Sequence, residues 1–293
     1  MFVLIGLAVV FALVFGGYTL AGGKLGIILH ALPFELMMIG GSAVGTFLMA
    51  NDAAVIKRTI GDIVLALKGP HHKKTDYEAL LCLLFEILRM ARTDPLALEV
   101  QIEDPQASEL FGRYPGIAHD LFAMAMIVDT MRYAGMQVDD PHQVDELIER
   151  DLEIHHAEML RPAEALQSMA DALPALGIVA AVLGVIKTMA SIDQPPAVLG
   201  KMIGGALVGT FLGIFLSYCL AGPLAARIKA IHEQDHSFYK LIRDVLRAHL
   251  QRHPPHVCAE IGRKNAPHAV RPSFGDLEQS INALKAQATK KAA

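Results

Sequence analysis

Four long apolar stretches constrain the fold of this chain more than any other feature of its sequence. They cover about residues 2–21, 34–50, 173–190 and 202–226, close to the roughly 20 apolar helical residues that a bilayer core of about 30 Å requires. The composition agrees, because charged residues make up only 19% of the 293 residues and the mean hydropathy is +0.38, whereas an ordinary soluble domain carries about 25% charged residues. The sequence therefore predicts an integral membrane protein with a substantial soluble part.

The basic residues beside these stretches predict the topology. No Lys or Arg precedes Lys24, and the first apolar run is longer than the core of a signal peptide, so we expect 2–21 to be a retained helix. Lys24 is the only basic residue between spans one and two. The flanks on the opposite side of the membrane carry more basic residues: Lys57, Arg58, Lys68, Lys73, Lys74, Arg161, Arg227 and Lys229. Because cytoplasmic flanks carry the excess of Lys and Arg, we expect both termini and the long middle segment to lie in the cytoplasm.

The charge balance and the cysteines exclude several classes of protein. The net charge is −4, which is of the wrong sign for a nucleic-acid binder. The three cysteines show no paired spacing, which argues against a disulfide framework and a cysteine-rich zinc module. No Walker A loop and no G-x-G-x-x-G motif is present in the sequence, so nothing indicates nucleotide-driven transport or any bound cofactor.

We predict an all-α fold in four parts: spans one and two at 1–50, a helical insertion at 51–171, spans three and four at 172–226, and a helical tail at 227–293. Apolar residues at helical spacing predict insertion helices at 77–90, 118–133 and 141–158. The tail should form one helix to about residue 250, a break at 253–256, and a last helix that begins near Ser273, a good N-cap residue.

Small residues line two of the spans. Gly205, Gly209 and Gly213 recur every fourth position in span four, and Gly177 and Gly184 share a face of span three. Small residues allow close approach of helix backbones, which is how helices associate in lipid. We predict that these five glycines mediate packing, both within the chain and between subunits.

Ionisable residues are scarce in the spans. Glu35, at the start of span two, and Lys187, near the outer end of span three, lie close enough to an interface for their charges to reach it. If an ion crosses here, we expect the titrating carboxylate to come from another chain. Thr210 and Tyr218 could supply polar lining to the path.

One motif indicates an enzyme instead. His232 and His236 with Glu233 match H-E-x-x-H, in which two histidines bind zinc and the glutamate acts as a base. Asp235 and the nearby basic residues argue against this membrane metalloprotease, since they are typical of a solvated helix beside the membrane.

The sequence resembles the flagellar stator A-subunits, the MotA/PomA family, over essentially its whole length. The matching runs are VFGGY at 14–18, FEL at 34–36, QIEDP at 101–105, DALPALGIVAAVLGV at 171–185, LVGTFLGI at 207–214, GPL at 222–224 and RPSF at 271–274. The resemblance implies a bacterial inner-membrane protein that forms a homopentamer around a dimer of MotB/PomB, the peptidoglycan-anchored partner that carries the ion-binding aspartate. The ExbB/TolQ relatives are an alternative, although their three spans and the RPSF tail of this chain disfavour it.

The resemblance also assigns roles to single residues. Pro174 and Pro223 match family prolines linked to coupling, although proline also suits the first turn of a helix and helix ends or kinks. Glu99 and Arg92, or Arg89 in place of Arg92, match the charged residues that face the rotor protein FliG. Ala181 stands where sodium-type relatives carry threonine, whereas both types retain Thr210, so we expect the translocated ion to be a proton.

Overall fold

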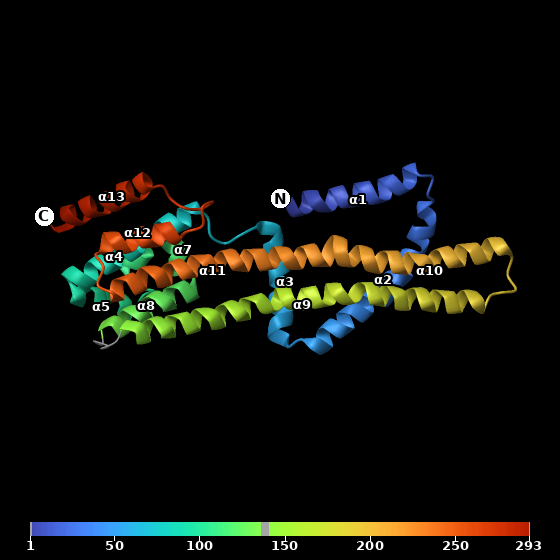
Figure 1. The fold of residues 1–293 in the computed structure, drawn as a ribbon, viewed down its shortest axis with the longest axis horizontal. Helices are drawn as coiled ribbons and strands as arrows, with labels where there is room; N and C mark the ends of the chain where they lie inside the picture. The colour runs from blue at the N-terminus through green and yellow to red at the C-terminus, as the bar shows by residue number, and fades with distance from the viewer. Residues whose placement is uncertain (1, 136–140, 293) are drawn as a thin grey trace. The chain divides into compact units, whose positions relative to one another are not determined.

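The computed structural model describes residues 2–135 and 141–292, and these residues form helices without any strand (Figure 1). The chain divides into two compact units. The membrane unit comprises Met1–Gly69 and Met159–Ile231, and the second unit comprises Pro70–Glu158 and His232–Ala293.

Four helices are long and apolar enough to cross a membrane, which confirms the predicted fold class. They are α1 (Phe2–Leu20), α2 (Leu25–Ala50), and the apolar parts of α9 (Pro141–Met189) and of the run that starts with α10 (Pro196–Leu216). Several boundaries differ from the prediction. Helix α2 begins nine residues before 34 and continues through Pro33, and the helix predicted at 141–158 is continuous with span three in α9.

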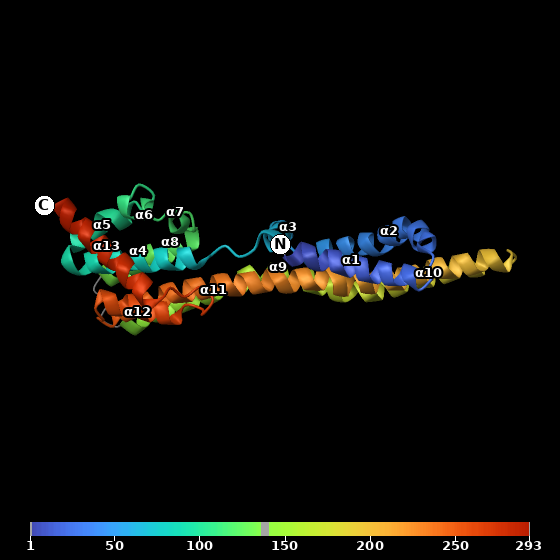
Figure 2. The same ribbon diagram turned by 90° about the horizontal axis from the view of Figure 1, so that it is seen from above.

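The membrane unit is held together by apolar and aromatic contacts. Helices α2 and α10 lie side by side (Figures 1 and 2). Phe11 and Phe15 of α1 pack edge-on against Phe215, with ring centroids 5.2 Å and 5.6 Å apart. Aromatic rings favour this edge-to-face geometry. Most residues of α1 are exposed, so these ring contacts are important for holding α1 against α10.

Helix α3 (Ala53–Lys68) was not predicted. Its N-terminus is capped by Asp52, whose Oδ1 accepts a hydrogen bond of 2.9 Å from the backbone N–H of Val55. On its other face, Ala66 packs against Ala163 and Ile228. The helix is thus part of the packing of the membrane unit.

The helix of span four continues past residue 226, the predicted end of the span. A five-residue π-helical turn, η1 (Ser217–Ala221), follows α10 and leads directly into α11 (Gly222–Leu250). The long tail helix to residue 250 is therefore confirmed, but it is continuous with the span.

The second unit is built around α4 (Lys74–Thr93), where every residue from Leu80 to Leu88 is buried. A helix that is buried all round must have packed neighbours on every side. The neighbours of α4 include α5 (Pro95–Glu103), α7 (Pro115–Ala118), α12 (Pro255–Asn265) and α13 (Phe274–Ala292). The unit also contains α6 (Glu109–Gly112), α8 (Leu121–Gly135) and parts of α9 and α11. The one acid in the buried run, Glu86, accepts hydrogen bonds from Arg113 and from the hydroxyl of Tyr114, at 2.6 Å and 2.7 Å.

The predicted N-cap of the last helix is present. The hydroxyl oxygen of Ser273 accepts from the backbone N–H of Asp276 at 3.1 Å, and Asp276 accepts in return from the N–H of Ser273 at 3.3 Å. Arg271 donates to the carbonyl oxygens of Ala266 and Lys264 at the end of α12. The RPSF run therefore ends one helix and begins the next.

Candidate functional site

Helices α9 and α10 approach each other along the predicted glycines. A Cβ added to Gly213 would lie 2.6 Å from the carbonyl oxygen of Leu173 and 2.8 Å from the Cα of Gly177. A Cβ added to Gly177 would lie 2.8 Å from the carbonyl oxygen of Gly209. These neighbours are backbone atoms, so only glycine allows this helix spacing. We call this contact the glycine seam.

The other predicted glycines differ in how tightly they are enclosed. A Cβ on Gly184 would lie 2.6 Å from the Cβ of Ala206, whereas one on Gly205 would meet only Ala31, at 4.0 Å. The glycine seam thus lies within one chain and involves Gly177, Gly184, Gly209 and Gly213, and Gly205 lies outside it.

Glu35 is buried in the membrane unit. Its side chain extends from the third turn of α2 to Gly209, is 5% exposed, and has a buried Oε2 without a hydrogen-bond partner among the described residues. The interpretation of Glu35 as an interfacial side chain is wrong, because α2 starts earlier than predicted and places this residue within the helix. An acid inside an apolar run was the signal for a functional position.

Pro174 lies far inside α9, half-buried, so its explanation as a first-turn proline is wrong. Proline has no N–H, so the carbonyl of Ala170 loses its helical partner at this point. Leu173, the residue before it, belongs to the glycine seam through its carbonyl oxygen. Pro174 therefore weakens α9 where α9 and α10 are closest.

Pro223 neither ends a helix nor begins one after a loop. It is the second residue of α11 and directly follows the π-helical turn, in which the N–H of Gly222 donates to the carbonyl oxygen of Ser217. A π-helical turn relieves the clash between a proline ring and the preceding turn, and such turns are frequent at functional sites. Tyr218 projects from this turn and is 73% exposed.

Ala181 and Thr210 lie on the two helices of the glycine seam, Ala181 on α9 and Thr210 on α10, and both are half-buried. Ala181 is seven residues after Pro174, so both occupy the same side of α9 two turns apart. Thr210 directly follows the seam residue Gly209.

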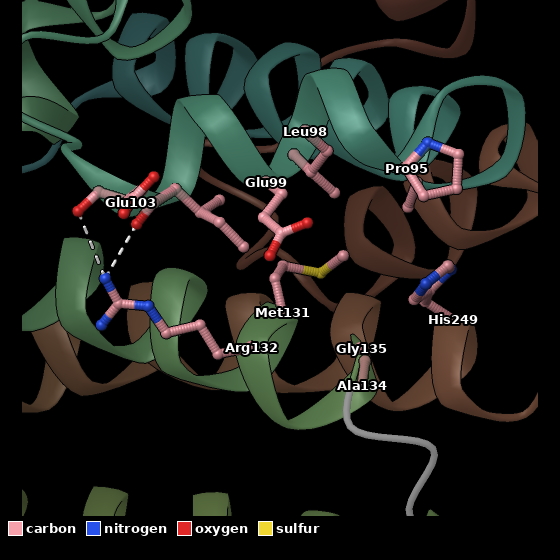
Figure 3. A pocket seen from close by; sticks show the side chains of 11 residues that line it. Pro95, Leu98, Glu99, Glu103, Met131, Arg132, Ala134, Gly135 and His249 are labelled. Carbon is pink, nitrogen blue, oxygen red and sulfur yellow. Dashed lines mark hydrogen bonds between the residues drawn. The ribbon is translucent and has the colours of Figure 1, made fainter.

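The residues expected to face the rotor all lie in the second unit. Glu99 is exposed on α5 and lines a cavity of about 520 Å³ between α5 and α8, where its side chain points toward Met131 (Figure 3). Opposite it, Arg132 donates to the carbonyl oxygens of Ile102 and Glu103 at 2.9 Å and 3.4 Å. Glu99 is thus available to a partner, whereas the cation across the cavity is held by backbone.

Arg92 and Arg89 differ in their contacts. The exposed Arg92 donates to the carbonyl oxygens of Arg252 and His253, at 2.7 Å and 2.8 Å, just after α11 ends. Arg89 is half-buried on α4, and its guanidinium group makes no hydrogen bond or ion pair within the described residues. Arg92 therefore joins α4 to the end of α11 as well as presenting a charge.

The side chains of the H-E-x-x-H motif are engaged in contacts within the second unit. His232 and Asp235 are 6% and 7% exposed, so the interpretation of this segment as a solvated helix is wrong. Asp235 lies 2.8 Å from Nδ1 of His71, and His236 stacks on His156 with centroids 3.8 Å apart. No group of three metal-binding side chains occurs in 2–135 or 141–292. The motif is part of the packing of the second unit.

The class of protein is identified by two family models and by solved structures with the same fold. Residues 123–240 match the model of the MotA/TolQ/ExbB proton channel family, and residues 4–95 match that of the motility protein A N-terminal region. Two solved structures share the fold: C. jejuni MotAB, with a TM-score of 0.72 at 21% identity over 93% of this chain and 98% of that one, and the Bacillus subtilis flagellar MotAB stator complex, with 0.66 at 23% over 88% and 92%. The chain is a multi-pass membrane protein of this channel class and not an enzyme.

Relatives of known function define the family more narrowly. Motility protein A of Salmonella typhimurium is 37% identical over 97% of this chain and 96% of its own length, and that of Escherichia coli is 36% identical over the same shares. The chemotaxis protein LafT of Vibrio parahaemolyticus is 34% identical over 94% of this chain and 96% of its own length. This chain belongs to the MotA family of flagellar stator subunits.

Proposed function

We propose that this chain forms the ring of a flagellar stator and, with a MotB-type partner, converts ion flow into rotor torque. The observation that carries this proposal is the 37% identity to motility protein A along nearly the full length of both chains. The glycine seam and both coupling prolines lie within or beside the region that matches the channel family.

The partner we propose is a MotB/PomB-type subunit anchored to peptidoglycan, with five copies of this chain around two copies of it in the bacterial inner membrane. Both solved relatives are described as MotAB complexes, which supports this partner. The described helices α1 and α10 carry no acidic residue. An ion-carrying aspartate from the partner would supply that group. We place both termini, 51–171 and 227–293 in the cytoplasm, following the distribution of basic residues.

The ion is a proton in this proposal. Ala181 offers no oxygen on α9 that could replace part of a sodium ion's hydration shell, whereas a proton needs only a carboxylate and water. The experiment is complementation of a strain that lacks motility protein A, with co-expression of the partner. Swimming should stop when a protonophore is added and should not change with external sodium. Swimming that follows external sodium would show the assignment to be wrong.

Torque transfer in this proposal uses Glu99, Arg89 and Arg92 against FliG. Exposed charge pairs contribute only about 0–1 kcal/mol each, which suits a contact that must form and release rapidly. In the complemented strain, Glu99→Lys should reduce swimming while membrane levels of the protein stay normal. Unchanged swimming would remove Glu99 from the rotor contact.

The ExbB/TolQ type of energy coupling is the second candidate, because the matching family model includes these proteins. The separate match of residues 4–95 to the motility protein A N-terminal region favours the stator. Complementation distinguishes the two: restored swimming supports the stator, and restored outer-membrane uptake without swimming supports the alternative.

A further inference from the structure

The membrane unit contains a cavity of about 540 Å³ between α2, α9 and α10. Its wall has two chemically different parts. His30, Lys187 and Lys201 contribute basic groups, whereas Phe34, Met38 and Leu183 contribute apolar surface. The cavity volume lies within the range of about 300–1,000 Å³ that is usual for sites of small ligands.

The basic part of the wall lies toward one end of the helices. Lys187 is two residues before the end of α9 at Met189, and Lys201 is five residues after the start of α10 at Pro196. The connection 190–195 joins these two helix ends. In a membrane-spanning helix, such positions correspond to the level of the lipid headgroups.

The two lysines have no counter-ion among the residues that the structure describes. Within the described residues, neither lysine ammonium group forms a hydrogen bond or ion pair, and the ring of His30 has no hydrogen-bond partner. Glu35 also lines the cavity, but no ion pair joins it to either lysine and its Oε2 is buried beside Gly209. Two cations at the edge of a low-dielectric layer favour a bound anion, because unneutralised charge is costly there.

We propose that this cavity binds one anionic phospholipid, with its phosphate between Lys187 and Lys201 and part of an acyl chain along Phe34, Met38 and Leu183. Charge complementarity selects a phosphate, and the apolar wall selects an amphiphile over a free anion. Basic residues near a membrane surface attract anionic lipid headgroups. The lipid would connect α2 to the end of α9 and α10 without a direct ion pair.

The experiment measures lipid retention by the complex of this chain with its membrane partner. The complex is purified after delipidation, titrated with phosphatidylglycerol or phosphatidylethanolamine, and analysed by native mass spectrometry. We expect tighter binding of phosphatidylglycerol, and about a fivefold loss of its affinity for each of Lys187→Gln and Lys201→Gln, since one basic residue near a membrane surface contributes about 1 kcal/mol.

Two further variants separate a specific site from general surface charge. Lys24→Gln removes a lysine beside the start of α2 that does not line the cavity, so it should leave the affinity unchanged. Leu183→Trp narrows the apolar part at a position that is 49% exposed, so it should reduce binding without a change in charge.

Three results would overturn the proposal. The first is retention of phosphatidylglycerol at the wild-type level by the Lys187→Gln and Lys201→Gln double variant. The second is displacement of the lipid by an excess of inorganic phosphate, which would show that a free anion is the occupant. The third is a change in the number of subunits in the same spectra on mutation of either lysine, which would identify the cavity as a contact between copies of the chain.

Discussion

At the scale of single residues, the absence of a side chain is as informative as its presence. In the glycine seam, the nearest atoms to the missing Cβ of Gly213 are backbone atoms of α9, whereas Gly205 faces only the methyl group of Ala31. Both residues belong to the same series of glycines, which recur every fourth position in the sequence. Spacing alone therefore predicts a glycine-lined helix face, but it does not distinguish the glycines that the packing requires.

Gly213→Ala should destabilise the membrane unit by about 1–3 kcal/mol, the usual cost of overpacking, because α9 and α10 must separate to admit the methyl group. Gly205→Ala is the matched control and should change stability by less than about 0.5 kcal/mol. The measurement is the thermal unfolding midpoint of the purified complex, followed by circular dichroism. Equal midpoints for the two variants would contradict the role given to the glycine seam.

Arg92 has a structural role in addition to the rotor contact that we propose for it. Arg92→Ala removes two charge-assisted hydrogen bonds to carbonyl oxygens beyond α11, so we expect the second unit to lose about 1–3 kcal/mol of stability. Arg89→Ala removes a similar charge one turn away without such bonds, so its unfolding midpoint should stay near that of wild type. If Arg89→Ala reduces swimming and leaves the unfolding midpoint unchanged, the rotor contact is assigned to Arg89. If Arg92→Ala has the midpoint of wild type, the hydrogen bonds of Arg92 contribute nothing to stability.

At the scale of helices, the long amphipathic and apolar segments could be predicted and the short ones could not. The stripe at 77–90 lies within α4, and Ser273 does cap α13. Helices α6 and α7 have four residues each, which is too short for a periodicity that is measured over 11 residues or more. Pro174 was interpreted as a proline of a first helical turn, but α9 continues through it.

Burial was the property that local sequence predicted least well. The charged run at 232–236 indicated a solvated helix, yet partners from distant parts of the chain bury it: His71 and His72 contact Asp235, and His156 stacks on His236. Glu35 was misplaced for the same reason, since its environment depends on α10 rather than on its neighbours in sequence. Such contacts arise only once the fold is formed.

The histidine pair of α9 and α11 makes the stability of the second unit depend on pH. Burial, followed by the neighbouring charges of His156 and Lys240, lowers the pKa of His236 to about 4, while Glu233 acts in the opposite direction. Between about pH 6.5 and 4 the unfolded chain therefore binds more protons than the folded chain, so stability must fall as the pH falls through this window. After allowance for solvent screening we expect a loss of about 1–2 kcal/mol.

The matched variant for this prediction is His236→Gln, which keeps a polar side chain but cannot be protonated. Its unfolding midpoint should fall less between pH 7 and pH 4 than that of wild type, in melts of the same complex. His72 and His249 have pKa values lowered by burial as well, so a smaller slope should remain in the variant. Identical slopes in the two proteins would show that His236 contributes no linkage.

At the scale of the whole molecule, each compact unit is assembled from two separate segments of the chain. The membrane unit joins 1–69 to 159–231, and the second unit joins 70–158 to 232–293. Two of the three passages between the units therefore occur inside the continuous helices α9 and α11. Pro174 and Pro223 lie in the membrane-unit parts of these same two helices, and each helix continues without a break into the second unit.

The last prediction concerns the division of work between chains. Helices α1 and α10 contain no acid, and the one acid of α2, Glu35, is buried against Gly209. We therefore expect that this chain, reconstituted alone into vesicles, does not conduct protons, and that co-reconstitution with the MotB-type partner does. The measurement is the pH change inside vesicles under an imposed membrane potential. Replacement of the partner's membrane-embedded aspartate by asparagine should abolish the flow without loss of the complex, because the amide cannot take up and release a proton. Conduction by this chain alone, lost in Glu35→Gln, would instead make Glu35 the ion carrier and overturn the division proposed here.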